Sequence, residues 1–373
     1  MDMLAPEQEF SRLELNLDHC RANYQYFRSK LRPETRMLVL VKANAYGHGA
    51  VEFAAAMRDL GADYLAVAYA VEGVELRRGG IMSPIMVLTT GTDFFDEIID
   101  YHLEPGIPNL ATLEALCQVL RAKKKKHYPI HLKLDTGMHR LGFMTSEIGA
   151  LTAYLKDCDL VRVTSIYSHL AAAEDPLQDD FTLGQIRQFQ TNAQRISDSL
   201  GYRPMFHVLN SAGIERFTQY QFDMVRLGIG IYGVSAVEGV ELAPVASFKC
   251  KILQIKTLLP EDGTIGYGRR GKIAAEGTTI ATIPVGYADG LDRHLGRGNA
   301  RFLLNGRRVP TIGNICMDMC MLDITGVPAE VGDTVTIFGE NPSVSELAGI
   351  LDTIPYEILT SVPRRIRRVI VKE

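Results

Sequence analysis

The stretch Met37-Leu38-Val39-Leu40-Val41-Lys42-Ala43-Asn44-Ala45-Tyr46-Gly47-His48-Gly49 decides the fold of this chain. Its first five residues are an apolar run with the length of a buried strand, and its glycines indicate a turn that follows. The strand therefore ends at Lys42. Burial disfavours the ammonium form there, and a neutral amine can condense with an aldehyde. The alternative is a lysine whose ammonium group reaches solvent before the turn.

Short apolar runs alternate with amphipathic helical stretches from residue 37 to about residue 230, a pattern typical of repeated βα units with parallel strands. The predicted strands are 37–41, 64–68, 85–88, 103–107, 130–134, 161–167, 206–209 and 224–229. The predicted helices include 49–60, 71–78, 110–121, 148–156, 183–200 and 211–216. Eight parallel strands with crossover helices close into a (β/α)8 barrel, so the fold class is α/β with an N-terminal TIM-like barrel.

The pattern changes after about residue 233 to short β-like runs separated by Gly, Pro and Asn. Strands are predicted at 246–255, 278–283, 301–304, 308–311 and 334–337. One helix is expected at 344–350, with Ser343 as its N-cap. The second part of the chain is therefore an all-β domain.

Composition excludes several classes of protein. Hydrophobic residues make up 46% and charged residues 23% of the chain, so neither a disordered nor a membrane protein is expected. The net charge of −4 gives no reason to expect nucleic acid. The six cysteines lack the spacing of a metal site. The first residues lack the basic and apolar segments of a secretory signal, which predicts a cytoplasmic protein.

Polar residues end, follow or lie within five of the predicted barrel strands, near the rim where barrel enzymes place their reactive groups. Each has an ordinary structural explanation, such as a helix-capping serine, a core histidine or an ion-paired arginine. Together they fall at one rim, which favours a catalytic site. The five are Lys42, Arg140, His169, Ser211 and Arg226.

These segments resemble, in their order and over nearly the whole chain, the alanine racemases. The resemblance lies in the Lys42 segment, in 133–142, 167–170, 210–213, 226–233 and 263–269, and in the 316–318 and 353–357 motifs. It implies that Lys42 binds pyridoxal 5'-phosphate (PLP) as a Schiff base. It also implies which residues contact the phosphate: Tyr46, Ser211, Gly228, Ile229 and Tyr356.

Arg226 indicates the type of reaction. A guanidinium stays charged and can only donate hydrogen bonds, so a pyridine nitrogen beside it should stay unprotonated. A weaker electron sink favours proton removal and return over transamination. The resemblance implies that His169 orients Arg226.

Racemisation requires a base on each face of the substrate Cα, and the resemblance supplies Lys42 and Tyr267. Because a free tyrosine titrates near about 10, Tyr267 would need cationic or hydrogen-bonded neighbours. The family places this tyrosine in the other subunit's site, which implies a head-to-tail homodimer. The substrate carboxylate is expected at Arg140 and Met317, together with Tyr287, and Lys133 matches a position that is often N-carboxylated.

The resemblance divides the chain into three parts. Residues 1–11 are a strand that joins the β-domain, residues 12–240 are the PLP-binding barrel, and residues 241–373 are the β-domain. His139 and Asn314 differ from the residues usual in the family. A decarboxylase of the same fold is opposed by Arg226, and a noncatalytic PLP carrier by the β-domain. A racemase of serine or another amino acid stays open. The expected function is interconversion of L- and D-alanine, which supplies D-alanine for peptidoglycan.

Overall fold

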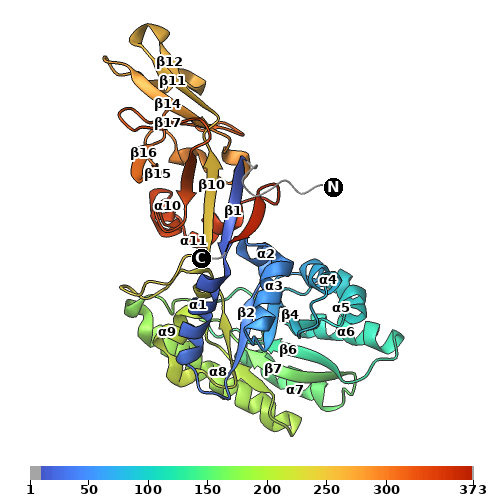
Figure 1. The fold of residues 1–373 in the computed structure, drawn as a ribbon. Helices are drawn as coiled ribbons and strands as arrows, with labels where there is room; N and C mark the ends of the chain where they lie inside the picture. The colour runs from blue at the N-terminus through green and yellow to red at the C-terminus, as the bar shows by residue number, and fades with distance from the viewer. Residues whose placement is uncertain (1–9, 372–373) are drawn as a thin grey trace.

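Eight parallel strands form one sheet in this computed structural model, which describes residues 10–371 (Figure 1). Their order is β8-β7-β6-β5-β4-β3-β2-β9. The edge strands meet through hydrogen bonds from Asp223 N to Phe206 O (3.1 Å) and from Arg226 N to Leu209 O (2.9 Å), so the sheet closes into a barrel. All eight predicted barrel strands are confirmed: β2 Arg36–Leu40, β3 Tyr64–Val67, β4 Ile85–Val87, β5 Glu104–Ile107, β6 Tyr128–Lys133, β7 Val161–Tyr167, β8 Met205–His207 and β9 Met224–Leu227.

Helices surround the barrel and alternate with its strands, as expected for crossover connections. The six predicted helices are present, and the sequence reading missed α1, α2 and α5. The observed helices of this part are α1 Leu17–Ser29, α2 Lys42–Tyr46, α3 Ala50–Asp59, α4 Ala70–Arg78, α5 Phe95–Asp100, α6 Leu110–Ala122, α7 Ile148–Lys156, α8 Asp179–Leu200 and α9 Ser211–Arg216. Helix α8 begins four residues earlier than predicted, with Asp179 and Asp180 in its first turn, where they favour the helix dipole.

The β-domain contains a six-stranded sheet in the order β16-β15-β18-β10-β1-β19 and a three-stranded sheet in the order β11-β14-β17. Its strands are β1 Ser11–Asn16, β10 Ala246–Lys251, β11 Gln254–Leu258, β12 Thr264–Ile265, β13 Gly271–Lys272, β14 Thr278–Ile283, β15 Arg301–Leu304, β16 Arg307–Pro310, β17 Cys320–Asp323, β18 Thr334–Phe338 and β19 Arg367–Val371. Helix α10, Val344–Ile350, is confirmed as predicted, and Ser343 Oγ accepts from Glu346 N (3.1 Å).

The predicted strand 246–255 is wrong as a single strand. The chain changes sheets within it: Ile252 N donates to Asp333 O (2.9 Å), whereas Leu253 N donates to Thr282 O (2.9 Å). The run therefore divides into β10 and β11. A continuous apolar pattern shows no sign of such a change of partner.

The first strand connects the two parts of the chain. β1 pairs antiparallel with β10 and parallel with β19, and it continues directly into α1. Residues 1–9 of the predicted N-terminal segment lie outside the described residues. The division at residues 12 and 240 stays a prediction. A boundary at residue 12 falls inside β1, Ser11–Asn16.

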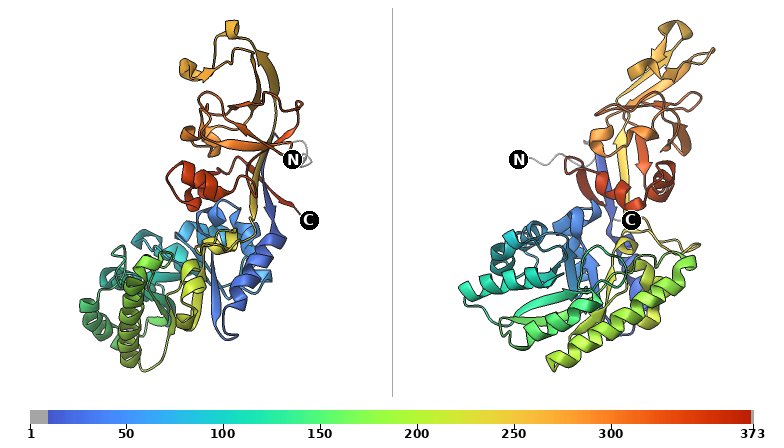
Figure 2. Two further views of the ribbon diagram at one scale, coloured as in Figure 1. Left: turned by 90° about the vertical axis from the view of Figure 1, so that its left-hand side faces the viewer. Right: turned by 180° about the vertical axis from the view of Figure 1, so that it is seen from behind.

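Contacts between the C-terminal region and the Lys42 segment hold the β-domain on the barrel (Figure 2). Helix α11, Pro355–Ser361, approaches so closely that a Cβ at Gly47 would lie 2.2 Å from Leu359 O. Arg368 Nε donates to Gly47 O (2.8 Å), and Arg364 pairs with Glu75 (2.7 Å). The position of Gly47 thus requires glycine both for space and for its φ of 83°.

Candidate active site

The backbone that follows Lys42 makes a left-handed turn of non-glycine residues. Ala43, Asn44, Ala45 and Tyr46 have φ values of 51°, 55°, 51° and 49°. This conformation costs about 1–2 kcal/mol for each residue with a Cβ. Such strain persists where surrounding structure enforces it, and it gathers at functional sites.

Glu72 of α4 anchors the start of this turn. Its carboxylate accepts from Ala43 N (2.6 Å), Ala68 N (2.7 Å) and Tyr69 N (3.0 Å). Asn44 adds a second anchor, because its Oδ1 accepts from Ala50 N at the start of α3 (3.0 Å). Lys42 is therefore presented from a backbone fixed on both sides.

Lys42 lies half-buried at the rim, where its surroundings favour the neutral amine. Burial is the largest influence and lowers the pKa of Lys42, the positive charge of Arg140 lowers it further, and Glu72 opposes both. A lysine with a lowered pKa is a better nucleophile toward an aldehyde and a better base near neutral pH.

The residues expected at the phosphate converge beside this turn. Ser211 Oγ accepts from Gly228 N (2.9 Å) and Gly230 N (3.2 Å). A Cβ added at Gly228 would lie 3.4 Å from Tyr46 Oη and 3.7 Å from Ser211 Oγ, so the three positions border one small space. Ile229 follows within the same turn and is buried.

Aromatic rings fix the Tyr46 side chain. Its ring stacks on Tyr232 at a centroid distance of 4.6 Å, and Tyr232 Oη donates to Leu40 O (2.7 Å). Tyr356 of α11 packs against Tyr46 at 5.6 Å. The tyrosine of the C-terminal motif is thus brought to the barrel rim, as expected.

Arg226 crosses the interior of the barrel and is held by its two terminal nitrogens. Nη2 donates to Ser168 O (2.6 Å) and Val208 O (3.1 Å) and contacts His169 Nδ1 (3.2 Å). Nη1 donates to His207 O (3.2 Å) and contacts His207 Nδ1 (3.1 Å). Within residues 10–371 no acceptor is bonded to Nε, which leaves that donor for a ligand.

The charge states around Arg226 follow from its burial. Burial lowers the pKa of Arg226 to about 10, so the guanidinium stays cationic at neutral pH. Burial, followed by the positive charge of Arg226, also holds the pKa of His169 and of His207 well below the ordinary value. Both imidazoles are therefore neutral acceptors toward Arg226.

The loop after β6 carries Arg140 and is folded around Asp135. The Asp135 carboxylate accepts from Gly137 N (3.0 Å) and His139 N (3.0 Å). Gly142 returns against it, because a Cβ there would lie 2.6 Å from Asp135 N. None of the ion pairs in the described part of the chain includes Arg140, so its exposed guanidinium is free for an anionic ligand.

Lys133 ends β6 beneath this loop and is buried. Burial, then the positive charges of Arg140 and Arg226, lowers the pKa of Lys133 to about 8. Its Nζ lies 5.9 Å from the centre of the Tyr167 ring. Four cationic side chains therefore gather here: Lys42, Lys133, Arg140 and Arg226.

Three expected site residues lie apart from this cluster, in the β-domain. Tyr267 follows β12, which Figure 1 places at the end of the β-domain away from the barrel, and its side chain is 70% exposed. Tyr287 and Met317 are neighbours, because Tyr287 N donates to Cys316 O (3.0 Å), and both are exposed. Asn314 Nδ2 donates to Tyr267 O (2.7 Å) and links the Tyr267 segment to the one that carries Met317.

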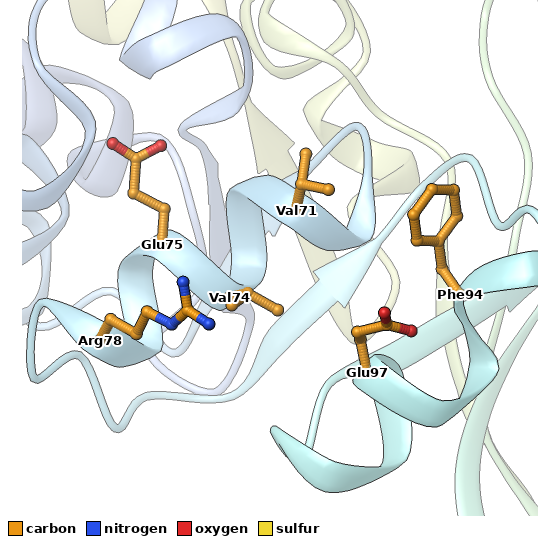
Figure 3. Close-up of a pocket in the computed structure, with 6 residues that line it drawn as sticks. All are labelled: Val71, Val74, Glu75, Arg78, Phe94 and Glu97. Carbon is orange, nitrogen blue, oxygen red and sulfur yellow. The ribbon is translucent and has the colours of Figure 1, made fainter.

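A surface pocket of about 370 Å3 lies outside both groups. Val71, Val74, Glu75 and Arg78 of α4 line one side, and Phe94 and Glu97 line the other (Figure 3). The pocket holds none of the expected site residues. In residues 10–371 no group of His, Cys, Asp and Glu side chains could hold a metal ion, and no helix has the length and apolarity to cross a bilayer.

Sequence reasoning missed His207, which lies inside the predicted strand 206–209 and is the last residue of β8. Beyond it, Ser165 and His131 are buried in the same interior layer. No local signal marked His207, because it is the second residue of that predicted strand and not its last. The interior serine and histidine carried none, because their meeting depends on the register of β6, β7 and β8.

The barrel features fit PLP on observations of this chain alone: a lysine with a lowered pKa at the start of a strained turn, a glycine bordered by a hydroxyl and a phenol, and a buried guanidinium with one spare donor. A carboxylate in the place of Arg226 would have indicated a protonated pyridine nitrogen and a stronger electron sink. The free Nε of Arg226 instead fits an unprotonated nitrogen acceptor.

The chain matches the family models "Alanine racemase, N-terminal domain" over residues 15–236 and "Alanine racemase, C-terminal domain" over residues 245–370. It is 36% identical to alanine racemase 1 of Clostridium acetobutylicum, covering 96% of this chain and 95% of that one. The solved alanine racemase of Clostridium difficile 630 superposes with a TM-score of 0.90 at 32% identity, covering 100% of this chain and 97% of that one. An alanine racemase from Bartonella henselae with covalently bound pyridoxal phosphate gives 0.86 at 27% identity, covering 97% and 100%.

Proposed function

The chain belongs to the alanine racemase family, and we propose that Lys42 and Tyr267 are the two bases with which it interconverts L- and D-alanine. The enzyme is a PLP-dependent amino acid racemase. When bound, the cofactor supplies an electron sink that acidifies the substrate Cα–H. The observation that carries the residue assignment is the convergence of Lys42, the Ser211–Gly228 recess and Arg226 at one rim of the barrel.

Lys42 serves one face of the substrate carbon. Its lowered pKa lets Nζ accept the Cα proton near neutral pH and return it. Tyr267 serves the opposite face, with its phenol oxygen holding or giving the other proton. A single base would tend to return its proton to the face that lost it, so inversion requires both groups.

A head-to-tail homodimer supplies the second base. Tyr267, Tyr287 and Met317 are exposed in the β-domain, and β12 lies at the end of that domain away from α2, the helix that begins with Lys42 (Figure 1). A two-fold dimer that places each β-domain on its partner's barrel would bring these three residues to both active sites. The exposed guanidinium of Arg140 and the backbone near Met317 would then bind the substrate carboxylate from both sides.

Lys133 is expected to carry a carbamate. Its pKa of about 8 leaves roughly a tenth of the amine neutral at pH 7, and a neutral amine attacks carbon dioxide with loss of one proton. The resulting anion would offset the charges of Arg140 and Arg226. With 13C-labelled bicarbonate, NMR of the enzyme should show a carbamate carbon that is lost in Lys133→Ala and kept in the surface variant Lys126→Ala. An equal spectrum for wild type and Lys133→Ala would contradict the assignment.

The physiological role proposed is D-alanine supply for peptidoglycan in the cytoplasm. The acidic net charge of −4 agrees with a small-molecule substrate and no nucleic acid partner.

Chiral chromatography tests the activity. The PLP-loaded protein is incubated with L-alanine and, separately, with L-serine, and D-product is measured over time. We expect L-alanine to approach an equal mixture of enantiomers, with serine slower. Faster conversion of serine would identify serine as the preferred substrate. Carbon dioxide release without D-product would indicate decarboxylation.

A further inference from the structure

We propose that Glu104, the first residue of β5, is a positioning residue that acts on Arg226 through a one-way chain of hydrogen bonds. The chain runs from Arg226 Nη1 to His207 Nδ1 (3.1 Å) and from His207 Nε2 to Ser165 Oγ (2.8 Å). It continues from Ser165 Oγ to His131 Nδ1 (2.6 Å) and ends between His131 Nε2 and Glu104 Oε2 (2.9 Å). The inference rests on the proposed function only for its kinetic test.

The barrel topology creates this chain. Its five members come from five successive strands, β9, β8, β7, β6 and β5, each beside the next in the closed sheet. Ser165 and His131 are direct cross-strand partners, and Gly106, two residues after Glu104, pairs with His131. The side chains therefore form one interior layer beneath the proposed cofactor site.

The two ends of the chain fix the direction of every proton in it. Arg226 can only donate, and the Glu104 carboxylate can only accept. His207 therefore accepts at Nδ1 and donates from Nε2, Ser165 donates onward, and His131 must also carry its proton on Nε2. Each of the four contacts then contains one hydrogen, and no donor or acceptor within the chain is opposed by its neighbour.

The hydrogen-bonded side chains are buried, which strengthens the influence of one end of the hydrogen-bond chain on the other. His131, Ser165 and His207 are all fully buried, and Arg226 is 4% exposed. The Tyr167 ring stacks on His207 at 5.3 Å and 13°, which restrains the imidazole from turning. In such an environment successive hydrogen bonds polarise one another, so a charge at one end is felt at the other.

Arg226 has no directly bonded carboxylate among the residues that the structure describes. None of the ion pairs among residues 10–371 includes Arg226. The charged groups that act on neighbouring Lys133 are Arg140, Arg226 and Lys42, opposed by Asp135. Glu104 is the anion that the chain joins to the guanidinium, and it thereby holds Nη1 in place and leaves Nε for the ligand.

The test uses two variants and a matched control. Ser165→Ala removes the central hydroxyl, and Glu104→Gln removes the terminal charge while keeping an acceptor. Ser197→Ala removes another buried hydroxyl, that of Ser197 in α8, which donates to Tyr202 O (3.3 Å) and takes no part in this hydrogen-bond chain. We expect kcat to fall about tenfold in Ser165→Ala and severalfold in Glu104→Gln, with KM nearly unchanged, and the control to keep wild-type kcat.

Imidazole 15N NMR provides a readout that is independent of activity. In the wild-type protein, both His131 and His207 should carry a proton on Nε2 and accept a hydrogen bond at Nδ1. Ser165→Ala should alter the tautomer of at least one of them, whereas Ser197→Ala should alter neither. A proton on Nδ1 of either histidine in the wild type would overturn the proposal, as would an unchanged kcat in both Ser165→Ala and Glu104→Gln. If the wild type racemised neither amino acid, the proposed function would be wrong, but the NMR result would still test the hydrogen-bond chain.

Discussion

Replacement of Lys42 by alanine is expected to reduce racemisation by about four orders of magnitude or more. The side chain is assigned both the covalent attachment of PLP and the removal of one Cα proton, and loss of a general base alone costs about 10²–10⁴-fold. The visible absorption of the lysine-bound cofactor should vanish, and borohydride should no longer fix cofactor to the protein.

The surface variant Lys126→Ala is the control for this experiment. Lys126 forms an exposed ion pair with Asp159, and exposed pairs contribute about 0–1 kcal/mol, so it should keep both activity and absorption. If Lys42→Ala retained a borohydride-reducible absorption at wild-type intensity, another amine would hold the cofactor. Lys133, the other buried lysine of the cluster, would be the first to examine.

The barrel could be predicted because its signals are local. Each of its strands is a short buried run, and the polar rim residues lie near the carboxyl ends of these runs or in the loops that follow. Ser211 shows how far this goes: it was expected at the start of a helix beside the last strand, and it begins α9 with its hydroxyl on the amides of Gly228 and Gly230.

Helix α1 was missed because its buried face is partly polar. Asn23 is buried, and its Nδ2 donates to Ala243 O (2.8 Å), so a side chain that reads as exposed instead holds the helix against the chain that leaves the barrel. The tight packing of this helix, where a Cβ at Gly230 would lie 2.3 Å from the Phe27 ring, likewise depends on a segment 200 positions away.

The left-handed turn after Lys42 could not be predicted either, because alanine and tyrosine disfavour it. It is imposed by partners from other elements. Glu72 binds Ala43 N from α4, and Leu359 presses on Gly47 from α11. The hydrogen-bond chain from Arg226 to Glu104 could not be predicted for a related reason, because local sequence does not determine strand register.

The second large effect concerns Tyr267. Tyr267→Phe removes only the phenol oxygen from a side chain that is 70% exposed within its own chain, so the fold and PLP binding should be unchanged. Racemisation should nevertheless fall by about 10²–10⁴-fold, because one face of the substrate would lack its base. A variant with wild-type turnover would disprove the two-base assignment.

Mixed dimers of Lys42→Ala and Tyr267→Phe test where that oxygen acts. If each site takes Lys42 from one subunit and Tyr267 from the other, a heterodimer has one site with both defects and one intact site. Heterodimers purified through two different tags should then show about half of wild-type activity, although each parent homodimer is nearly inactive. If both bases came from one chain, every site would carry one defect and no activity would return. The exposure of Tyr267 and the position of β12 away from the barrel favour the shared site.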